Sequence, residues 1–174
     1  MKTVKKILCP LDLSGYSGEI AEYASVMARI FDAEVVIVNV VPIIVDEVIL
    51  RVKGAQKVLD EFSGALSLSA EEKIDKFVTQ YFTGVRASGA ILEGNEAKRI
   101  LAFAEEGEFD LIIMGTHGKQ GFDHFLFGSV AEKVVRGAKI PVITMKPKEA
   151  AEAVRAAKKR LGKWAVSLPN VVFR

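Results

Sequence analysis

Cysteine is almost absent from this sequence, because Cys9 is the only one among 174 residues. A single cysteine cannot build a disulfide framework, and a chain of this length can bury a core without one. One cysteine and two histidines, His117 and His124, are too few for a closed zinc site, which takes about four such ligands. We therefore expect no structural metal, and we expect Cys9 to be a small buried hydrophobic side chain.

The sequence also lacks an apolar run long enough to cross a membrane. Its longest apolar stretch, residues 35–45, is interrupted by Asn39 and Pro42 and is much shorter than the roughly 20 residues of a membrane-spanning helix. The first residues are basic but reach Asp12 too soon for the apolar part of a secretory signal. These features predict a cytoplasmic protein that does not insert into a membrane.

No charge of one sign dominates the chain, which has 24 Lys and Arg against 22 Asp and Glu. The balance is nevertheless uneven, since residues 147–174 hold seven Lys or Arg against two Asp or Glu, and residues 1–146 hold 17 against 20. The larger part is slightly acidic, so it is not expected to bind nucleic acid. A hydrophobic content of 50% excludes a disordered chain.

Short apolar runs separated by helical patterns predict an α/β fold. The five runs typical of strands are 4–12, 34–41, 85–92, 109–114 and 139–146. Strands that alternate with helices form a parallel, doubly wound sheet with helices on both faces. The run 85–92 is the least apolar, and the run 139–146 contains Pro141, which has no N–H to donate. Both runs are therefore expected at sheet edges.

Apolar residues at helical spacing predict the first three helices. Ser17 is the expected N-cap of a helix whose apolar face includes Ile20 and Phe31. Residues 46–82 also show helical spacing, but Gly64 and a nearby serine-rich run weaken the middle, so one broken helix or two helices are expected. A third helix opens at Gly94-Asn95 and closes near Gly107.

Two further helices are predicted in the last third of the chain. Ser129 and Glu132 fit a capping box, in which the serine hydroxyl and the glutamate carboxylate each accept a backbone N–H, so a helix is expected to begin with Ser129 as its cap and to stop at Gly137. From Pro147 the composition changes to an Ala-rich helix and then to an apolar end. We therefore divide the chain into a main domain, residues 1–146, and an extension, residues 147–174, that docks on its own domain or on a partner subunit.

The two best-known phosphate-binding motifs are absent. A P-loop requires Gly-Lys followed by Ser or Thr, whereas Gly118-Lys119 is followed by Gln120. A dinucleotide fingerprint requires three glycines in the first strand-to-helix turn, and residues 10–15 contain only Gly15. Neither a P-loop nor a dinucleotide site is therefore predicted.

A different glycine loop follows the fourth predicted strand. Gly115 and Gly118 are followed, after nine residues, by Gly128-Ser129 at the start of a helix. Glycines let the backbone approach a ligand closely, and the helix N-terminus offers unpaired N–H groups and a partial positive charge. The pattern indicates an anion site, and the alternative is an ordinary turn with glycines in left-handed conformations.

Together with Pro10-x-Asp12-x-Ser14 after the first strand, this loop resembles the ATP-binding branch of the universal stress protein family over residues 4–146. The resemblance implies a strand order of 3-2-1-4-5, ATP bound without the usual ATPase machinery, and homodimers formed through the fifth strand, residues 139–146. A physical argument indicates the same place. If the first and fourth strands are neighbours, Asp12 and Gly115 flank the switch point where open α/β sheets bind ligands.

The resemblance also assigns a role to each predicted site residue. The residues that would line the adenine and ribose end are Pro10, Asp12 and Val40, with Met114 and Gly115 beside them. The residues that would hold the phosphates are Gly118, Gly128, Ser129 and Val130, with Lys119 as a further point charge. The remaining predicted nucleotide-binding residues are Leu11, Ser14 and His117. Asp12 is also the expected carboxylate for a magnesium ion bound with ATP.

The predicted function is that of an ATP-binding stress-response or signalling protein, and two alternatives stay open. One is a slow ATPase or phosphotransferase that uses Asp12, His117 and Lys119, although no oriented nucleophile and base can be identified. The other is a nucleotide-free dimerisation module. At Asp123-His124 many family members have a small residue followed by arginine, and Asp123 would repel a phosphate that it faced. Asp12 and Ser14 have the further alternative of a turn hydrogen-bonded to its own backbone.

Overall fold

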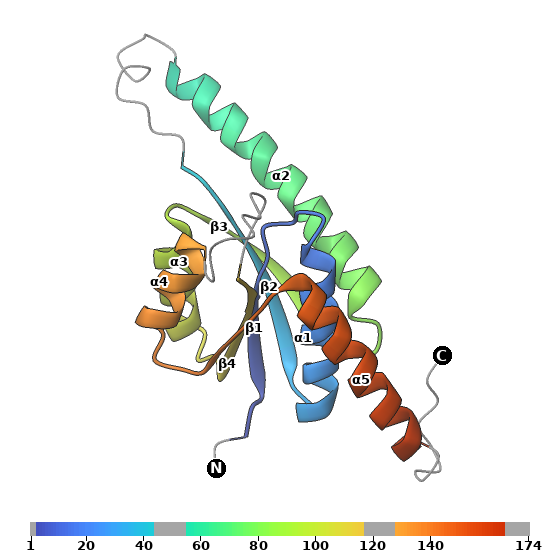
Figure 1. Cartoon of the computed structure of the whole chain (residues 1–174). Helices are drawn as coiled ribbons and strands as arrows, with labels where there is room; N and C mark the ends of the chain where they lie inside the picture. The colour runs from blue at the N-terminus through green and yellow to red at the C-terminus, as the bar shows by residue number, and fades with distance from the viewer. Residues whose placement is uncertain (1–2, 44–54, 117–127, 166–174) are drawn as a thin grey trace.

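The computed structural model describes residues 3–43, 55–116 and 128–165. These residues form a five-stranded parallel sheet with the order β3-β2-β1-β4-β5 (Figure 1). The strands are β1 (Lys6–Pro10), β2 (Glu34–Val41), β3 (Ala87–Glu93), β4 (Leu111–Gly115) and β5 (Val142–Met145). The predicted α/β class, the strand order and the edge positions of β3 and β5 are confirmed.

The described helices are α1 (Ser17–Phe31), α2 (Ala55–Tyr81), α3 (Glu96–Glu106), α4 (Ser129–Gly137) and α5 (Pro147–Ala165). The start and end of α3 are as predicted, with Asn95 before the helix and Gly107 after it, and the Asn95 side chain caps the helix by accepting the Lys98 N–H at 3.2 Å. The expected break near Gly64 is wrong, since α2 is continuous from Ala55, and the earlier part of the predicted helix lies outside the described residues. Gly137 is the last residue of α4 rather than a stop after it.

Both predicted serine caps are wrong by one position. The N-cap of α1 is Tyr16 and that of α4 is Gly128, so Ser17 and Ser129 are the first residues inside their helices. The Glu132 N–H donates to the Gly128 carbonyl at 3.0 Å, which makes Gly128 the acceptor of the first helical bond. Neither cap residue accepts a helix N–H through its side chain.

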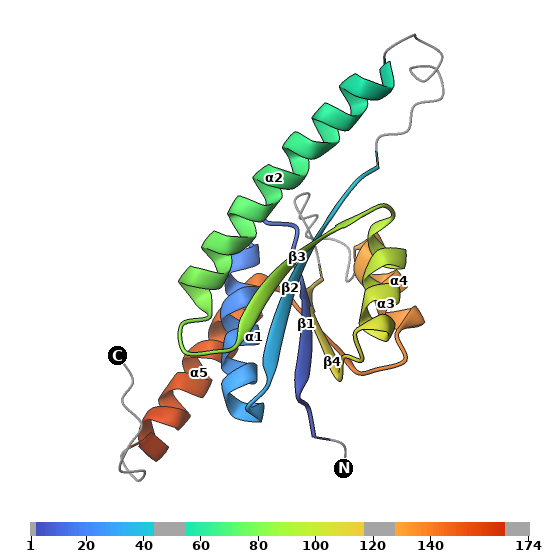
Figure 2. The same cartoon turned by 180° about the vertical axis from the view of Figure 1, so that it is seen from behind.

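Two hydrophobic clusters lie on opposite faces of the sheet, beneath the helices that cover each face in Figure 2. The first cluster packs β1 and β2 against α1 and α2, with Ile7, Ile37 and Ile74 at 2% exposure or less. The second packs the other face against α3 and α4, with Ile112 and Val134 fully buried. Because β1, β2 and β4 are covered on both faces, their sequences are nearly continuous apolar runs, with Asn39 of β2 as an exception, as is usual for central parallel strands.

The α5 helix packs against α1 on the same side of the sheet (Figure 1). Val154 is 2% exposed, and the Lys158 ammonium pairs with the Glu22 carboxylate of α1. Charged residues of α5 such as Arg155 and Lys159 stay exposed. The described part of the C-terminal extension therefore covers α1 and leaves a basic outer surface.

Candidate nucleotide site

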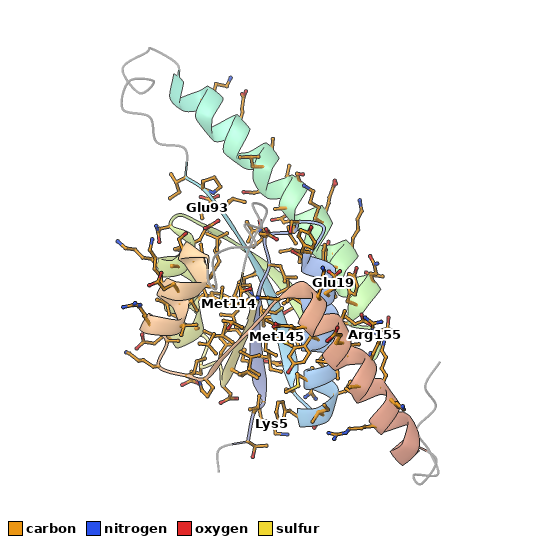
Figure 3. All side chains as sticks on the ribbon, in the orientation of Figure 1. Lys5, Glu19, Glu93, Met114, Met145 and Arg155 are labelled. Carbon is orange, nitrogen blue, oxygen red and sulfur yellow. The ribbon has the colours of Figure 1, made fainter. Side chains whose placement is uncertain are left out.

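The carboxyl ends of β1 and β4 lie next to each other and define the candidate site. The two strands pair directly, with Ile7 opposite Leu111 and Leu8 opposite Ile112. The chain leaves β1 for α1 and leaves β4 for α4, and these helices cover opposite faces of the sheet. This divergence creates the switch point that open α/β sheets use to bind ligands. Figure 3 shows Glu93 at this end of the sheet and Lys5 at the opposite end.

The first loop of the site is organised by one oxygen of Asp12. Asp12 Oδ1 accepts the Ser14 backbone N–H at 3.1 Å and the Ser17 hydroxyl at 2.7 Å. Ser17 is 3% exposed, so this hydroxyl bond is shielded from water. The turn hydrogen-bonded to its own backbone, expected as an alternative role for Asp12, is thus present. It occupies only one of the two carboxylate oxygens.

The other carboxylate oxygen of Asp12 and the hydroxyl of Ser14 lack a hydrogen-bond partner among the described residues. Asp12 Oδ2 and Ser14 Oγ are buried and make no hydrogen bond to any described residue. A buried polar atom without a partner costs about 1–3 kcal/mol, and a charged one costs more. Such atoms in a folded protein need an explanation, and a ligand that hydrogen-bonds them would supply one.

Leu13, between these two residues, adopts a strained backbone. Its φ is 55°, in the left-handed region that non-glycine residues seldom occupy. This conformation costs about 1–3 kcal/mol and is held where the surroundings require it. The Leu13 side chain packs against the cluster beneath α1, which anchors the strained residue. Leu13 is thus the strained residue of the turn in which the Ser14 N–H donates to Asp12 Oδ1.

Asn39 is a residue of the site that the sequence analysis did not assign. Its side-chain Nδ2 donates to the Leu11 carbonyl at 2.8 Å, and the Leu11 N–H donates to the Val38 carbonyl at 2.9 Å. These two bonds fix the chain where it leaves β1 against β2. The available signal was the polar Asn39 within an otherwise apolar strand.

The second loop is described only at its two ends. Gly128 N–H donates to the Thr116 carbonyl at 2.7 Å, and Thr116 N–H donates to the Met145 carbonyl at 3.0 Å. The start of α4 is therefore held directly beside the end of β4. His117, Gly118 and Lys119, together with the divergent pair at 123–124, lie outside the described residues.

The N-terminus of α4 meets the requirements of an anion site. The first N–H groups of a helix have no partner within the helix, and the Gly128 cap provides no side chain to accept them. Ser129 is exposed in the first turn, so its hydroxyl is accessible beside these donors. The partial positive charge of the helix end adds to their attraction for an anion.

The apolar residues predicted for the site lie in two groups. Val40, Met114 and Val130 belong to the cluster beneath α3 and α4, and Met114 is 5% exposed. Leu11 belongs to the cluster beneath α1 and is 6% exposed. Pro10 is the last residue of β1, between the two groups. The fold thus brings an apolar wall, the Asp12 loop and the α4 N-terminus to one end of the sheet.

Cys9 lies in β1 just before this loop but is not available for chemistry. Burial raises the pKa of its thiol to about 12, so the thiolate is scarce at neutral pH and Cys9 is not a nucleophile.

Among the described residues, no three His, Cys, Asp or Glu side chains gather where a metal ion would bind. Within the same residues, no helix is sufficiently long and apolar to traverse a bilayer.

Comparisons with known proteins agree with this geometry. The model of the universal stress protein family matches residues 3–146. Universal stress protein MJ0531 of Methanocaldococcus jannaschii is 39% identical over 142 residues, which are 82% of each chain. The solved structure of hypothetical protein MJ0577 has a TM-score of 0.70 at 26% identity, covering 83% of this chain and 97% of its own.

A further solved structure shares the fold at lower identity. It is the universal stress protein from Archaeoglobus fulgidus in complex with dAMP, with a TM-score of 0.52 and 22% identity. The match covers 83% of this chain and 100% of that structure. The family match extends over all five strands and both parts of the candidate site. The chain therefore belongs to the universal stress protein family.

Proposed function

We propose that this protein is a cytoplasmic stress-response protein that binds ATP at the carboxyl ends of β1 and β4 without efficient turnover. The observation that carries the proposal is the pair of buried atoms without a partner, Asp12 Oδ2 and Ser14 Oγ. Both belong to the loop in which Asp12 Oδ1 already accepts the Ser14 N–H and the Ser17 hydroxyl. A hydroxyl-bearing ligand such as a ribose would satisfy them.

The residues of the site suit the three parts of a nucleotide. ATP consists of a flat aromatic base, a sugar with hydroxyl donors and a chain of anionic phosphates. Val40 is only partly buried and offers an apolar surface for the base, with Met114 buried in the same cluster, and Asp12 offers an acceptor for the sugar. Gly128 and the first turn of α4 offer N–H donors for the phosphates. Backbone donors explain why this part of the motif specifies glycines more than charges.

The comparisons support an adenine nucleotide as the class of ligand. The Archaeoglobus fulgidus protein, which has the same fold, was solved as a complex with dAMP. Family membership also supports a role in the stress response. ATP rather than a monophosphate is our inference, because the α4 N-terminus provides a place for phosphates beyond the first.

We further infer that the protein forms a homodimer through the open edge of β5. The Ile112 N–H donates to the Pro141 carbonyl and the Thr116 N–H to the Met145 carbonyl, each at 3.0 Å. Bonds alternate along a parallel pair, so Val142 and Thr144 direct their own N–H and C=O groups away from β4. A second β5, related by a two-fold axis, would pair with these groups.

The test of nucleotide binding begins with purified protein. After heat precipitation, anion-exchange chromatography of the supernatant is expected to show ATP or ADP, and calorimetry with ATP and Mg²⁺ on nucleotide-free protein is expected to show saturable binding. Asp12→Asn replaces the acceptor Oδ2 by a donor. It should weaken binding by about tenfold to a hundredfold, since a hydrogen bond to a charged group contributes about 1.5–3 kcal/mol.

Asp32→Asn is the matched control for that variant. Asp32 lies at the other end of the sheet, where its carboxylate is 84% exposed and pairs with Lys5 at 3.6 Å. This variant should bind ATP like the original chain. Absence of nucleotide in the supernatant together with no calorimetric signal rejects the proposal, as does equal binding by the Asp12→Asn and original chains. Release of phosphate by the original chain above the Asp12→Asn background would show turnover.

A further inference from the structure

The outer edge of β3 offers a row of backbone groups for another strand. Val35 N–H donates to the Arg86 carbonyl and Gly94 N–H to the Val41 carbonyl, each at 2.9 Å, and the register between them is unbroken from Val35 to Val41 of β2. Because bonds alternate along a parallel pair, the β3 residues that face outward are the alternate ones, namely Ala87, Gly89 and Ile91. In the described part of the chain, no strand pairs with that side.

This edge has few of the features that protect exposed strands from pairing. Natural edge strands are commonly short, bulged, or provided with Lys or Pro. β3 has seven residues, ASGAILE, with neither Lys nor Pro, and its pairing with β2 contains no bulge. Ser88 and Gly89 are exposed. The strand is thus regular and accessible over a length that can bind an extended peptide.

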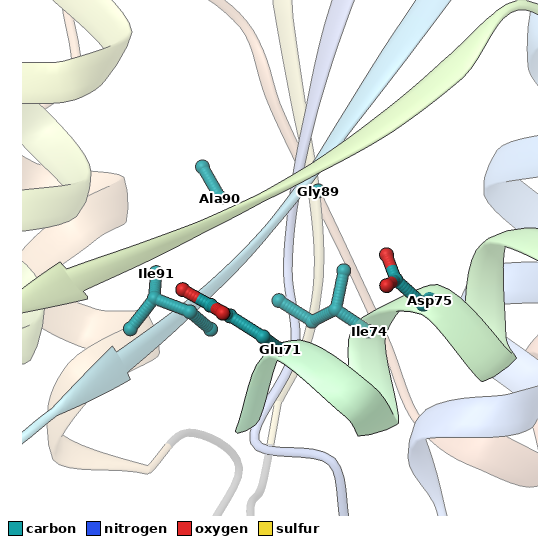
Figure 4. A pocket seen from close by; sticks show the side chains of 6 residues that line it. All are labelled: Glu71, Ile74, Asp75, Gly89, Ala90 and Ile91. Carbon is teal, nitrogen blue, oxygen red and sulfur yellow. The ribbon is translucent and has the colours of Figure 1, made fainter. Parts of the chain in front are cut away.

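A cavity lies directly beside this edge. It has a volume of about 300 Å³ and lies between α2 and β3, lined by Glu71, Ile74, Asp75, Gly89, Ala90 and Ile91. Gly89 creates the close approach of the two elements, because a Cβ there would lie 1.9 Å from Ile74 Cγ2. Figure 4 shows Ile74 and Ile91 on the α2 side of the strand and Ala90 on the other side.

Two carboxylates of α2 border the cavity. Glu71 and Asp75 lie on either side of Ile74, both exposed, and Figure 4 shows the Glu71 side chain extending toward Ile91. Neither makes an ion pair with a described residue. Like charges four residues apart on a helix repel each other. The helix therefore presents, along an open strand edge, two carboxylates that make no ion pair within the described part of the chain.

We propose that the β3 edge binds an extended segment of another protein that carries Lys or Arg at two positions separated by one residue. Such a segment adds a strand to the sheet, with backbone bonds to Gly89 and its outward neighbours and with side chains that alternate between the two faces. Alternate side chains on a strand repeat every 6.6 Å or about that distance. Glu71 and Asp75 are separated by roughly 6 Å along the helix axis. The two spacings match, and α2 runs alongside β3 (Figure 2).

The charge of the cavity argues against a second copy of this chain at the same edge. A two-fold pairing of β3 with β3 would bring Glu71 and Asp75 of both copies to one interface. Like charges placed opposite each other oppose association. A basic partner instead neutralises both carboxylates, so the β3 edge differs in its preferred partner from the β5 edge.

The test uses the full-length protein and two fluorescein-labelled ten-residue peptides of equal composition. In one peptide the two lysines are separated by one valine, and in the other they are adjacent, which places them on opposite faces of a strand. Fluorescence anisotropy is expected to show binding of the first peptide at least about tenfold tighter than of the second. The pair Glu71→Lys and Asp75→Lys should weaken the first peptide by at least about tenfold, because two attractive pairs become repulsive.

A matched charge control is the pair Glu106→Lys and Glu152→Lys. Glu106 lies on α3 and Glu152 on α5, both are exposed, and neither helix lines the cavity, so peptide affinity should change less than about twofold. An equal loss of peptide affinity in the two double variants would mean that only the net charge of the protein attracts the peptide. That result would overturn the proposal. No detectable binding of the first peptide would do the same.

Amide hydrogen exchange locates the bound peptide. In the free protein the N–H groups of Ala87, Gly89 and Ile91 should exchange quickly, and the bound peptide should slow all three, while Ser88 and Ala90 are slow throughout. Slowing confined to Val142 and Thr144 of β5 would overturn the proposal. The outward β3 amides could instead exchange slowly in the free protein. If deleting residues 166–174 then made them fast, the edge would be occupied by this chain itself. If dilution made them fast, the edge would be occupied by a second copy.

Discussion

The two edges of the sheet are both open strands, yet they differ in length and in what lies beside them. β5 has four residues and follows Pro141, whereas β3 has seven residues and lies along a helix with two carboxylates that form no ion pair with any residue the structure describes. Near β5 the ammonium of Lys139 pairs with the Glu105 carboxylate at 2.6 Å, so the charge of Lys139 is compensated. An open edge therefore supplies the hydrogen bonds for association, and the neighbouring side chains decide which partner fits.

The helix beside β3 depends on one glycine. Gly89→Ala places a methyl group 1.9 Å from Ile74 Cγ2, and Ile74 is 2% exposed and cannot turn into solvent. We expect a loss of about 1–3 kcal/mol in the free energy of unfolding, measured by urea denaturation, as is usual for overpacking a core. Ser88→Ala, on the exposed neighbour, should change stability by less than about 0.5 kcal/mol.

A double-mutant cycle shows whether the effect of Gly89→Ala comes from that contact. Ile74→Ala alone should cost about 2–5 kcal/mol, because it empties part of the core. Added to this background, Gly89→Ala should cost little, giving a coupling energy of roughly 0.5–3 kcal/mol. Strictly additive costs would contradict the assigned contact between α2 and β3.

The edges should also respond differently to proline. Thr144→Pro removes an outward N–H of β5 and leaves the bonds between β4 and β5 intact, so the fold should persist. A two-fold dimer then loses two hydrogen bonds of about 1 kcal/mol each, and its dissociation constant should rise about thirtyfold in sedimentation velocity. Ala87→Pro makes the same change at β3 and should leave the dimer unchanged. Dissociation by Ala87→Pro alone would reverse the roles of the two edges.

Local sequence patterns predicted the elements that depend on local physics. β2 spans residues 34–41 as predicted, because a β-branched, almost wholly apolar run of this length specifies a central strand. The start and end of α3 were also correct, since Asn95 acts on its own helix. Ser17 and Ser129 were misassigned as caps because a serine at the start of a helix fits two adjacent positions equally well. In the fold, Asp12 accepts the Ser17 hydroxyl, which therefore serves the loop.

The candidate site was predictable only where a motif marks it. The family resemblance indicated Asp12 and the glycine loop, but not the bond from Asn39 to Leu11, which joins residues 28 apart in the chain. The left-handed conformation of Leu13 has no local signal, since leucine does not favour it. The β3 groove arises where Gly89 meets Ile74, and no sequence pattern specifies that tertiary contact.

The smallest expected effect concerns the carboxylates that distinguish the β3 edge. Asp75→Lys replaces a like-charge pair by a Glu71–Lys pair four residues apart, in the favourable order along the helix. Removing the repulsion and adding the attraction each contribute about 0.2–0.5 kcal/mol. Urea denaturation at low salt should therefore show an increase of about 0.4–1 kcal/mol in the free energy of unfolding, and this increase should shrink as salt is added. The same variant should bind the alternating-lysine peptide more weakly. A stabilising change that removes binding would mean that the carboxylates serve association at a cost to folding. Destabilisation by Asp75→Lys would instead mean that Asp75 is paired within the chain, and the contrast between the two edges would lose its electrostatic basis.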